Sequence, residues 1–162
     1  MKLYDTLPEL SDGNVFIGSV TEEDLPALRE ITDGNMMLSA AESHGRDFET
    51  KKRVIAGIYL ADTPVGVAEI SDYREETGSA TVYCVIGERF RHRGIATRAL
   101  ALMQRYLLLQ CGLFSLTAYV KPENTDAVRV LLRCGFVRQG RDGREDVYTC
   151  DIGGAYGTVG CV

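Results

Sequence analysis

The chain has 162 residues, of which 45% are hydrophobic and 25% charged, which is typical of one globular domain and excludes a disordered chain; no apolar segment reaches the length of a membrane span. The net charge of −5 argues against nucleic acid binding and is compatible with a cationic amine as substrate. Five cysteines without CxxC spacing predict free thiols in a reducing, cytoplasmic compartment, and two distant histidines argue against a metal site.

The first half of the chain alternates between short apolar runs and helix signals. Thr21 to Asp24 reads as a helix start, with a Thr cap and acids in the first turn. The predicted elements are a strand at 14–19 after a turn at 11–13, a helix from 21 to about 33, a broken helix at 36–50, and a hairpin with strands at 52–60 and 65–71.

The second half predicts two strands joined by a long helix. Apolar runs at 79–86 and 113–120 flank good helix formers at 96–111, so we expect a right-handed β-α-β crossover. A helix at 124–134 and a hairpin with strands at 136–139 and 146–151 follow. We therefore expect one domain over 1–152, with a Gly-rich tail at 153–162.

A short basic loop connects the strand at 79–86 to the helix after it. Such a connection gathers backbone N–H groups at a helix N-terminus, which is suited to binding phosphate. Arg91, His92 and Arg93 add cationic donors, while Gly94 and Ala96 leave room for a ligand on the backbone. The alternative interpretation is a strand-to-helix turn with a solvated basic surface.

Two segments of the chain resemble the motifs of one enzyme family. Residues 91–96, Arg-His-Arg-Gly-Ile-Ala, resemble the [Q/R]-x-x-G-x-[G/A] signature of the GNAT superfamily of acetyl-CoA-dependent N-acetyltransferases. Residues 124–136 resemble its N-x-x-[A/S]-x-x-x-[L/Y]-x-x-x-G-F segment. The resemblance extends over about residues 15–151, and Pro-Glu-Asn at 122–124 looks most like the RimJ/RimL-like branch that acetylates N-termini of ribosomal proteins.

The resemblance implies an α+β (α/β) GNAT fold, with a mixed, twisted sheet of about six to seven strands flanked by about four helices. It also implies acetyl-CoA as cosubstrate, bound in the opening between the strand at 79–86 and the strand at 113–120, without a metal. The coenzyme-binding residues that it implies are Val85, Ile86, Arg91, His92, Arg93, Gly94, Ile95, Ala96, Thr97, Asn124 and Arg129. For Asn124, helix capping is the alternative role, and for Arg129 the alternative is a solvent-facing position.

The chain departs from the family at the general acid. Many members carry a Tyr seven residues after the Asn, or a Ser three residues after it, but Leu131 and Ala127 stand at these positions. Tyr83 and Tyr119 are candidate replacements, although the alternative for each is a core or groove-wall aromatic. Glu69, in an otherwise apolar strand, is the candidate general base, and its alternative is a solvent-facing position.

The expected function is N-acetyl transfer from acetyl-CoA to a primary amine, either a protein N-terminal α-amine or a small amine, by direct attack in a ternary complex. The alternative is a GNAT-fold module that binds acyl-CoA without turnover, which the residues at 127 and 131 permit. A protein-interaction domain without coenzyme is a third possibility. We expect a monomer or a homodimer.

Overall fold

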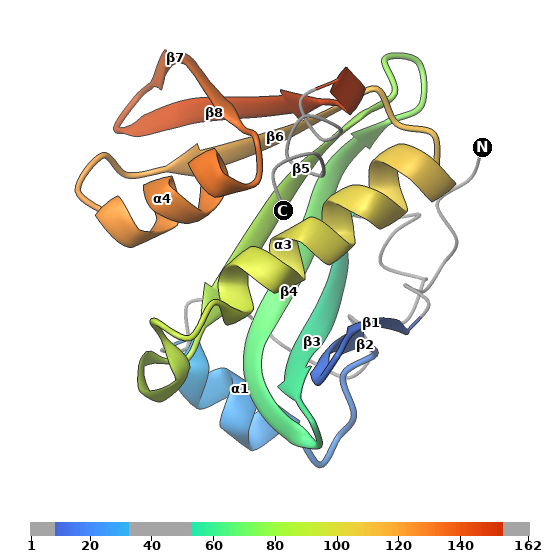
Figure 1. The fold of residues 1–162 in the computed structure, drawn as a ribbon, viewed down its shortest axis with the longest axis vertical. Coiled ribbons are helices and arrows are strands. Elements are labelled where there is room, and N and C mark those ends of the chain that lie inside the picture. The colour runs from blue at the N-terminus through green and yellow to red at the C-terminus, as the bar shows by residue number, and fades with distance from the viewer. Residues whose placement is uncertain (1–8, 33–52, 154–162) are drawn as a thin grey trace.

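An eight-stranded sheet forms the centre of the computed structural model, which describes residues 9–32 and 53–153 (Figure 1). Its order is β1-β2-β3-β4-β5-β6-β8-β7, and β5 and β6 form its one parallel pair. The strands are β1 (Leu10–Asp12), β2 (Val15–Gly18), β3 (Val54–Leu60), β4 (Thr63–Arg74), β5 (Ser79–Ile86), β6 (Ser115–Val120), β7 (Val137–Asp142) and β8 (Glu145–Asp151). The expected mixed α+β class is confirmed.

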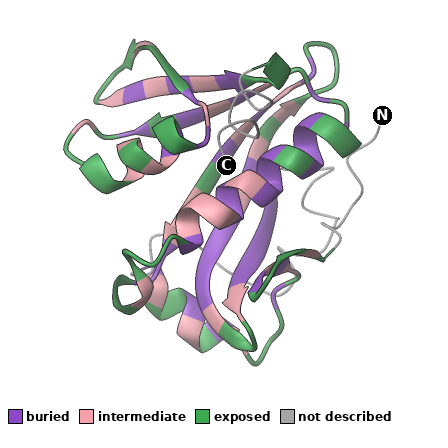
Figure 2. Cartoon of the chain, viewed as in Figure 1, coloured by how far each residue is buried: buried purple, intermediate pink, exposed green. Residues whose placement is uncertain are grey.

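Helices cover both faces of the sheet. On one face lies α3 (Ile95–Gln104), continued by a π-helical segment (Arg105–Gln110), and α1 (Leu25–Ile31) lies on the other. α4 (Thr125–Arg133) follows β6, and the 3-10 turn Glu88–Phe90 precedes α3. The strands beneath α3 are buried, as is the sheet-facing side of that helix (Figure 2).

Strand alternation explains why one sheet serves two cores. Residues such as Ile70 and Val82 pack in a large cluster with Met103 of α3, whereas Ile55 and Val67 pack with Leu28 of α1. Nearly continuous apolar runs in β3 and β4 are therefore buried on both sides.

Several predicted boundaries differ from the structure. The sheet has eight strands rather than six or seven, because Leu10–Asp12 pairs with Val15–Ile17 although only a turn was expected there. β4 continues to Arg74 through a bulge after Ser71. The structure describes three α-helices rather than four; the broken helix predicted at 36–50 and residues 154–162 of the predicted tail lie outside the described residues.

The first helix also starts later than predicted. It begins at Leu25, since Thr21 donates its hydroxyl to Asp24 Oδ2 at 2.7 Å and does not cap the helix. The Tyr59 hydroxyl donates to the same carboxylate oxygen at 2.8 Å, so Asp24 fastens α1 to β3. Within 9–32 and 53–153, no helix combines the length and apolarity needed to cross a membrane.

The parallel strands β5 and β6 pair only at their first residues. Their register covers Ser79–Thr81 against Ser115–Thr117 and then ends. Beyond this point β5 stays paired to β4 as far as Ile86, and β6 stays paired to β8 as far as Val120. The two strands therefore separate toward their C-terminal ends, which opens the sheet beside α3 and α4 (Figure 1).

A buried amide connects the elements on one side of this opening. The Gln104 side chain on α3 donates through Nε2 to the Cys134 carbonyl at 2.6 Å and contacts Cys150 Sγ at 3.3 Å. Gln104 is buried, and its partners belong to the end of α4 and to β8. Its amide thus connects α3 to the end of α4 and to β8.

Replacing this amide should destabilise the fold. We expect Gln104→Met to lower the free energy of unfolding by about 1–3 kcal/mol, because the buried carbonyl of Cys134 loses its amide donor. Urea denaturation measures the change, and the exposed Gln110→Met serves as the control, with an expected change within about 0.5 kcal/mol. Equal stability of Gln104→Met and wild type would contradict this role.

Candidate functional site

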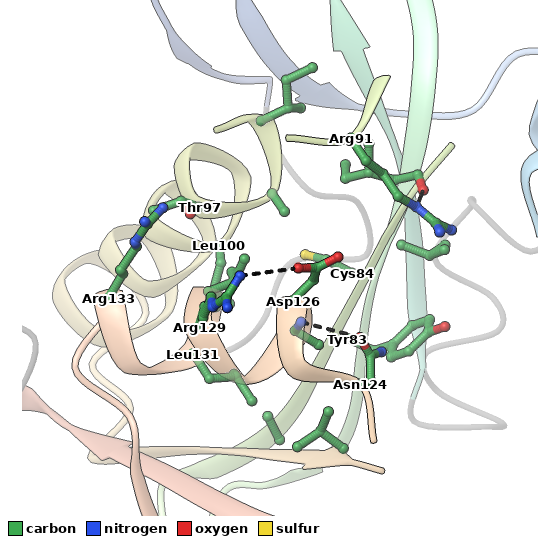
Figure 3. A pocket seen from close by; sticks show the side chains of 18 of the residues that line it. Tyr83, Cys84, Arg91, Thr97, Leu100, Asn124, Asp126, Arg129, Leu131 and Arg133 are labelled. Atoms are coloured by element: carbon green, nitrogen blue, oxygen red, sulfur yellow. Dashed lines mark hydrogen bonds and ion pairs between the residues drawn. The ribbon is translucent and has the colours of Figure 1, made fainter. Parts of the chain in front are cut away.

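A cavity of about 740 Å³ lies in the opening between β5 and β6 (Figure 3). Its walls are the C-terminal halves of these strands, the loop that leads into α3, the first turns of α3, and α4. Its volume lies within the usual range of small-molecule sites, roughly 300–1,000 Å³. Most predicted site residues line it: Tyr83, Val85, Ile86, Arg91, His92, Gly94, Ile95, Ala96, Thr97, Tyr119, Asn124 and Arg129.

The N-terminus of α3 forms one end of this cavity. Gly94 occupies the N-cap position in a left-handed conformation, with φ of 76°, and no side-chain hydrogen bond caps the helix. A Cβ atom added at Gly94 would meet nothing within 4 Å, so the space in front of the helix is open. First-turn N–H groups and the helix dipole favour an anion at this position.

The predicted basic residues differ in their placement. Arg91 lines the cavity, and its Nε donates to the Ile86 carbonyl at 2.9 Å, which anchors the loop to the end of β5. Arg93 is not among the lining residues, and its guanidinium lies over the Phe90 ring, 5.9 Å from the centroid. Of the two arginines predicted in this loop, only Arg91 lines the cavity.

Residues of α4 add charge to the opposite wall. Asp126, Arg129 and Arg133 line the cavity, together with Lys121 from the preceding loop. Arg129 Nη1 lies 3.7 Å from Asp126 Oδ1. The position of Arg129 was predicted from the motif, whereas Asp126 was missed, although it lies three residues before Arg129 and so on the same helix face.

Asn124 caps α4 and lines the cavity at once. Its Oδ1 accepts a hydrogen bond from the Ala127 N–H at 3.2 Å, which is the usual N-cap contact. The capping role is thus confirmed, and it leaves the amide nitrogen of Asn124 for a ligand. Ala127 and Leu131, the two positions that depart from the family motif, also line the cavity and carry no proton donor there.

Backbone pairing determines which N–H groups of β5 face the opening. The Gly87 N–H donates to the Val65 carbonyl at 2.8 Å, and Val85 is paired with Val67. In an antiparallel ladder, peptide groups point alternately to the two sides, so those of Val85 face β4. The N–H groups of Cys84 and Ile86 therefore face the side where β6 has moved away.

On the α1 face of the sheet, Glu69 lies beside Tyr83. The two residues are direct cross-strand partners, so their side chains share this face. The Glu69 side chain is only 18% exposed, and Oε1 lies 3.2 Å from Arg53 Nε. Burial raises the pKa of the Glu69 carboxyl, and Arg53 offsets part of that rise. Glu69 is not a solvated residue, but it does not line the cavity.

Two tyrosines line the cavity from neighbouring strands. Tyr83 is 47% exposed and Tyr119 is 40% exposed, so neither is a core aromatic. Burial raises the pKa of the Tyr83 phenol, and the nearby thiol of Cys84 and carboxylate of Glu69 raise it further. Tyr83 therefore keeps its proton at neutral pH.

Sequence reasoning missed Arg53 and Glu145 at this end of the site. Arg53 precedes β3 and reaches Glu69 on β4, while Glu145 begins β8 and lines the cavity. Both contacts depend on strand register, and no local sequence signal identifies them. Among the described residues, no group of three or more His, Cys, Asp or Glu side chains is arranged to hold a metal ion.

Solved structures share this fold at low sequence identity. Mycobacterium smegmatis RimJ in complex with CoA-disulfide has a TM-score of 0.71 at 19% identity, covering 95% of this chain and 93% of that chain. RimL, a ribosomal L7/L12 alpha-N-protein acetyltransferase, has a TM-score of 0.75 at 14% identity, covering 90% and 98%. The microcin C7 self-immunity acetyltransferase MccE, in complex with acetyl-CoA and AMP, has a TM-score of 0.70 at 16% identity, covering 87% and 94%.

No curated protein matches the chain by sequence. A family model does: the model described as an acetyltransferase (GNAT) domain matches residues 15–137. This match includes the β5–β6 opening, the α3 loop and α4. The chain therefore belongs to the GNAT acetyltransferase family.

Proposed function

We propose that the protein transfers the acetyl group of acetyl-CoA to a primary amine, by direct attack in a ternary complex. The observation that carries the proposal is a cavity in which a separated pair of parallel strands meets an uncapped helix N-terminus. Such a cavity suits a ligand with an anionic head and an extended amide-containing arm. RimJ with CoA-disulfide and MccE with acetyl-CoA have the same fold, which supports this ligand class.

The coenzyme is proposed to lie along the cavity with its diphosphate at α3. The N–H groups of Ile95, Ala96 and Thr97 would bind the phosphate oxygens, with Arg91 and Arg129 as additional cationic donors. The pantetheine arm would pair with the exposed edge of β5, as an added strand does. Asn124 would donate its side-chain amide to the arm from the α4 side.

The thioester carbonyl needs a hydrogen-bond donor where negative charge develops. Of the two coenzyme-binding residues expected at the end of β5, Ile86 is favoured over Val85 as this donor, because strand alternation directs the Ile86 N–H toward the opening. The departing thiolate has an ordinary pKa of about 8.5, so a weak acid is sufficient to protonate it. Tyr83 and Tyr119 line the cavity and are the proposed donors in place of the missing motif Tyr.

The amine must lose a proton before it attacks. An α-amine with a pKa of about 7.7–8.0 costs about 1 kcal/mol to deprotonate at pH 7, whereas a lysine amine costs about 4–5 kcal/mol. Glu69 is the proposed base, acting from the α1 face beside Tyr83. Because Glu69 does not line the cavity itself, a water molecule is proposed to relay the proton. A base that acts only through water favours α-amines, which are the easier amines to deprotonate, and RimL is an alpha-N-protein acetyltransferase.

Thiol release from acetyl-CoA tests the function and its main alternative. The acceptor panel comprises α-amino peptides, polyamines, aminoglycosides and free amino acids. We expect release that depends on an α-amine. Coenzyme binding without thiol release for any acceptor would instead favour a module that binds acyl-CoA without turnover. The observation that favours this module is that Ala127 and Leu131, which carry no proton donor, stand where many family members have a Ser or a Tyr.

We also propose a reducing, cytoplasmic location. In the described part of the chain, Cys84, Cys111, Cys134 and Cys150 are all free thiols. Five cysteines, an odd number without CxxC spacing, support a compartment that does not drive disulfide formation.

Substituting Gly94 should abolish coenzyme binding while the fold remains. In Gly94→Glu, a carboxylate would enter the open space before α3 and repel the diphosphate. Gly143→Glu is the matched control, since Gly143 also has a positive φ of 62° and open space but lies on the β7–β8 turn. Calorimetric titration with coenzyme A measures the loss. Equal affinity in both variants would count against the proposed diphosphate position.

Substituting Glu69 should remove the acid limb of the pH profile. The raised pKa means that Glu69 loses its proton, and gains activity as a base, above its ordinary value of 4.5. We expect Glu69→Gln to lower kcat/KM by roughly 10²-fold or more, as for loss of a general base. In Arg53→Gln the limb should move to higher pH, because Arg53 lowers the pKa of Glu69.

The exposed Glu76→Gln is the control for the Glu69 experiment and should keep the wild-type profile. An unchanged acid limb in Glu69→Gln would exclude Glu69 as the base and leave deprotonation to solvent.

Cys84 bears on the choice between direct transfer and an acyl-enzyme. It lines the cavity, but burial raises the pKa of its thiol to about 12, and its Sγ lies 3.5 Å from Met103 Sδ. A thiol is a weak nucleophile compared with a thiolate, so Cys84 is poorly suited to accept the acetyl group.

Cys84→Ala is therefore expected to retain acetyl transfer within about twofold. At pH 8 the thiol stays protonated, so iodoacetamide should modify Cys84 of the wild type slowly, as measured by peptide mass. Loss of more than tenfold in kcat, with unchanged thermal stability, would indicate a covalent role instead.

A further inference from the structure

A carboxylate lies at the end of the cavity where the diphosphate is proposed to bind. Asp126, the second residue of α4, projects into the cavity with Arg129 (Figure 3). Its Oδ2 lies 3.8 Å from His92 Nε2, and its Oδ1 lies 3.7 Å from Arg129 Nη1. The other carboxylate among the lining residues, Glu145, belongs to β8.

Asp126 connects the two walls of this end of the cavity. His92 belongs to the loop before α3, whereas Asp126 and Arg129 belong to α4. The contacts exceed hydrogen-bond length, and the three side chains are well exposed, so each interaction is weak and readily exchanged. His92 and Arg129 therefore already have a partner before any ligand binds.

We propose that Asp126 is an internal competitor of the coenzyme's diphosphate, an inference that rests on the proposed function. Its carboxylate contacts His92 and Arg129 in the free protein and must give up these contacts when a diphosphate binds to the two side chains. It also lines the cavity that the anion would enter, and like charges a few ångströms apart repel one another even in water. The carboxylate thus weakens coenzyme binding at the end of the cavity where His92, Arg129 and the α3 N-terminus would otherwise strengthen it.

This competition acts equally on substrate and product. Acetyl-CoA and coenzyme A carry the same diphosphate, so a carboxylate beside it weakens both complexes to the same extent and has no effect on the acyl-transfer step itself. Weaker product binding means faster product release, since affinity differences at one site lie mainly in the dissociation rate. Asp126 is therefore a determinant of coenzyme affinity and not a catalytic residue.

Calorimetric titration with coenzyme A tests the competition without needing an acceptor. We expect Asp126→Asn to bind coenzyme A about three- to tenfold more tightly at low salt, with a steeper loss of affinity as salt rises. Pantetheine, which lacks the diphosphate, should bind both proteins equally. The exposed Glu123→Gln is the matched control, because it removes the same charge from the segment before α4 but outside the cavity lining.

The outcomes separate the two proposals. If the wild type binds coenzyme A and Asp126→Asn binds it equally or more weakly, the competition is overturned while the proposed function stands. A gain shared by Glu123→Gln reflects net charge alone and also overturns it. If the wild type does not bind coenzyme A, the proposed function fails and the inference fails with it. Asp126→Ser should repeat the result of Asp126→Asn, and thermal melting confirms that both variants are folded.

Discussion

The separation of β5 from β6 is the constraint on which the rest of this molecule depends. Each strand pairs over a longer stretch with its other neighbour: β5 pairs with β4 as far as Ile86, and β6 pairs with β8 as far as Val120. Twist then drives the two strands apart after Thr81 and Thr117. Beyond Thr81, the peptide groups on this edge of β5 have no partner in β6, and backbone N–H and C=O groups need hydrogen-bond partners when they are shielded from water. The exposed edge of β5 is therefore the natural place for an extended ligand.

Two chemically different ends follow from that opening. At α3, an uncapped helix N-terminus and residues such as Arg91 and Arg129 provide positive potential, moderated by Asp126. On the α1 face, Glu69 and Tyr83 provide a partly buried acid and a protonated phenol. A ligand that passes from one end to the other would have its anionic group at the first and its reacting group at the second. This polarity is the physical basis of the proposed acetyl transfer.

The local pattern of the chain was sufficient to predict most elements and the uncapped helix N-terminus at Gly94. The β-α-β unit is visible because an apolar strand, a loop ending in Gly94 and a long run of helix formers follow one another. The N-cap role of Asn124 is likewise predictable from the sequence, since an N-cap residue bonds only to the first turn of its own helix. Such features depend on residues a few positions apart, and the structure agrees with them closely. Boundaries such as the start of α1 differ because Asp24 also bonds to Tyr59 of β3.

Only the tertiary structure decided which side chains meet. Arg53 and Glu69 are 16 positions apart, and His92 and Asp126 are 34 apart, so only strand register and helix packing bring each pair together. The structure also places Arg91 in the cavity lining but not Arg93, although the two positions look equally favourable in the sequence. By itself, the sequence determined the fold class and the helix terminus that suits an anion, because both arise from local periodicity and local geometry. The charges that surround the site depend on long-range contacts, which no local pattern encodes.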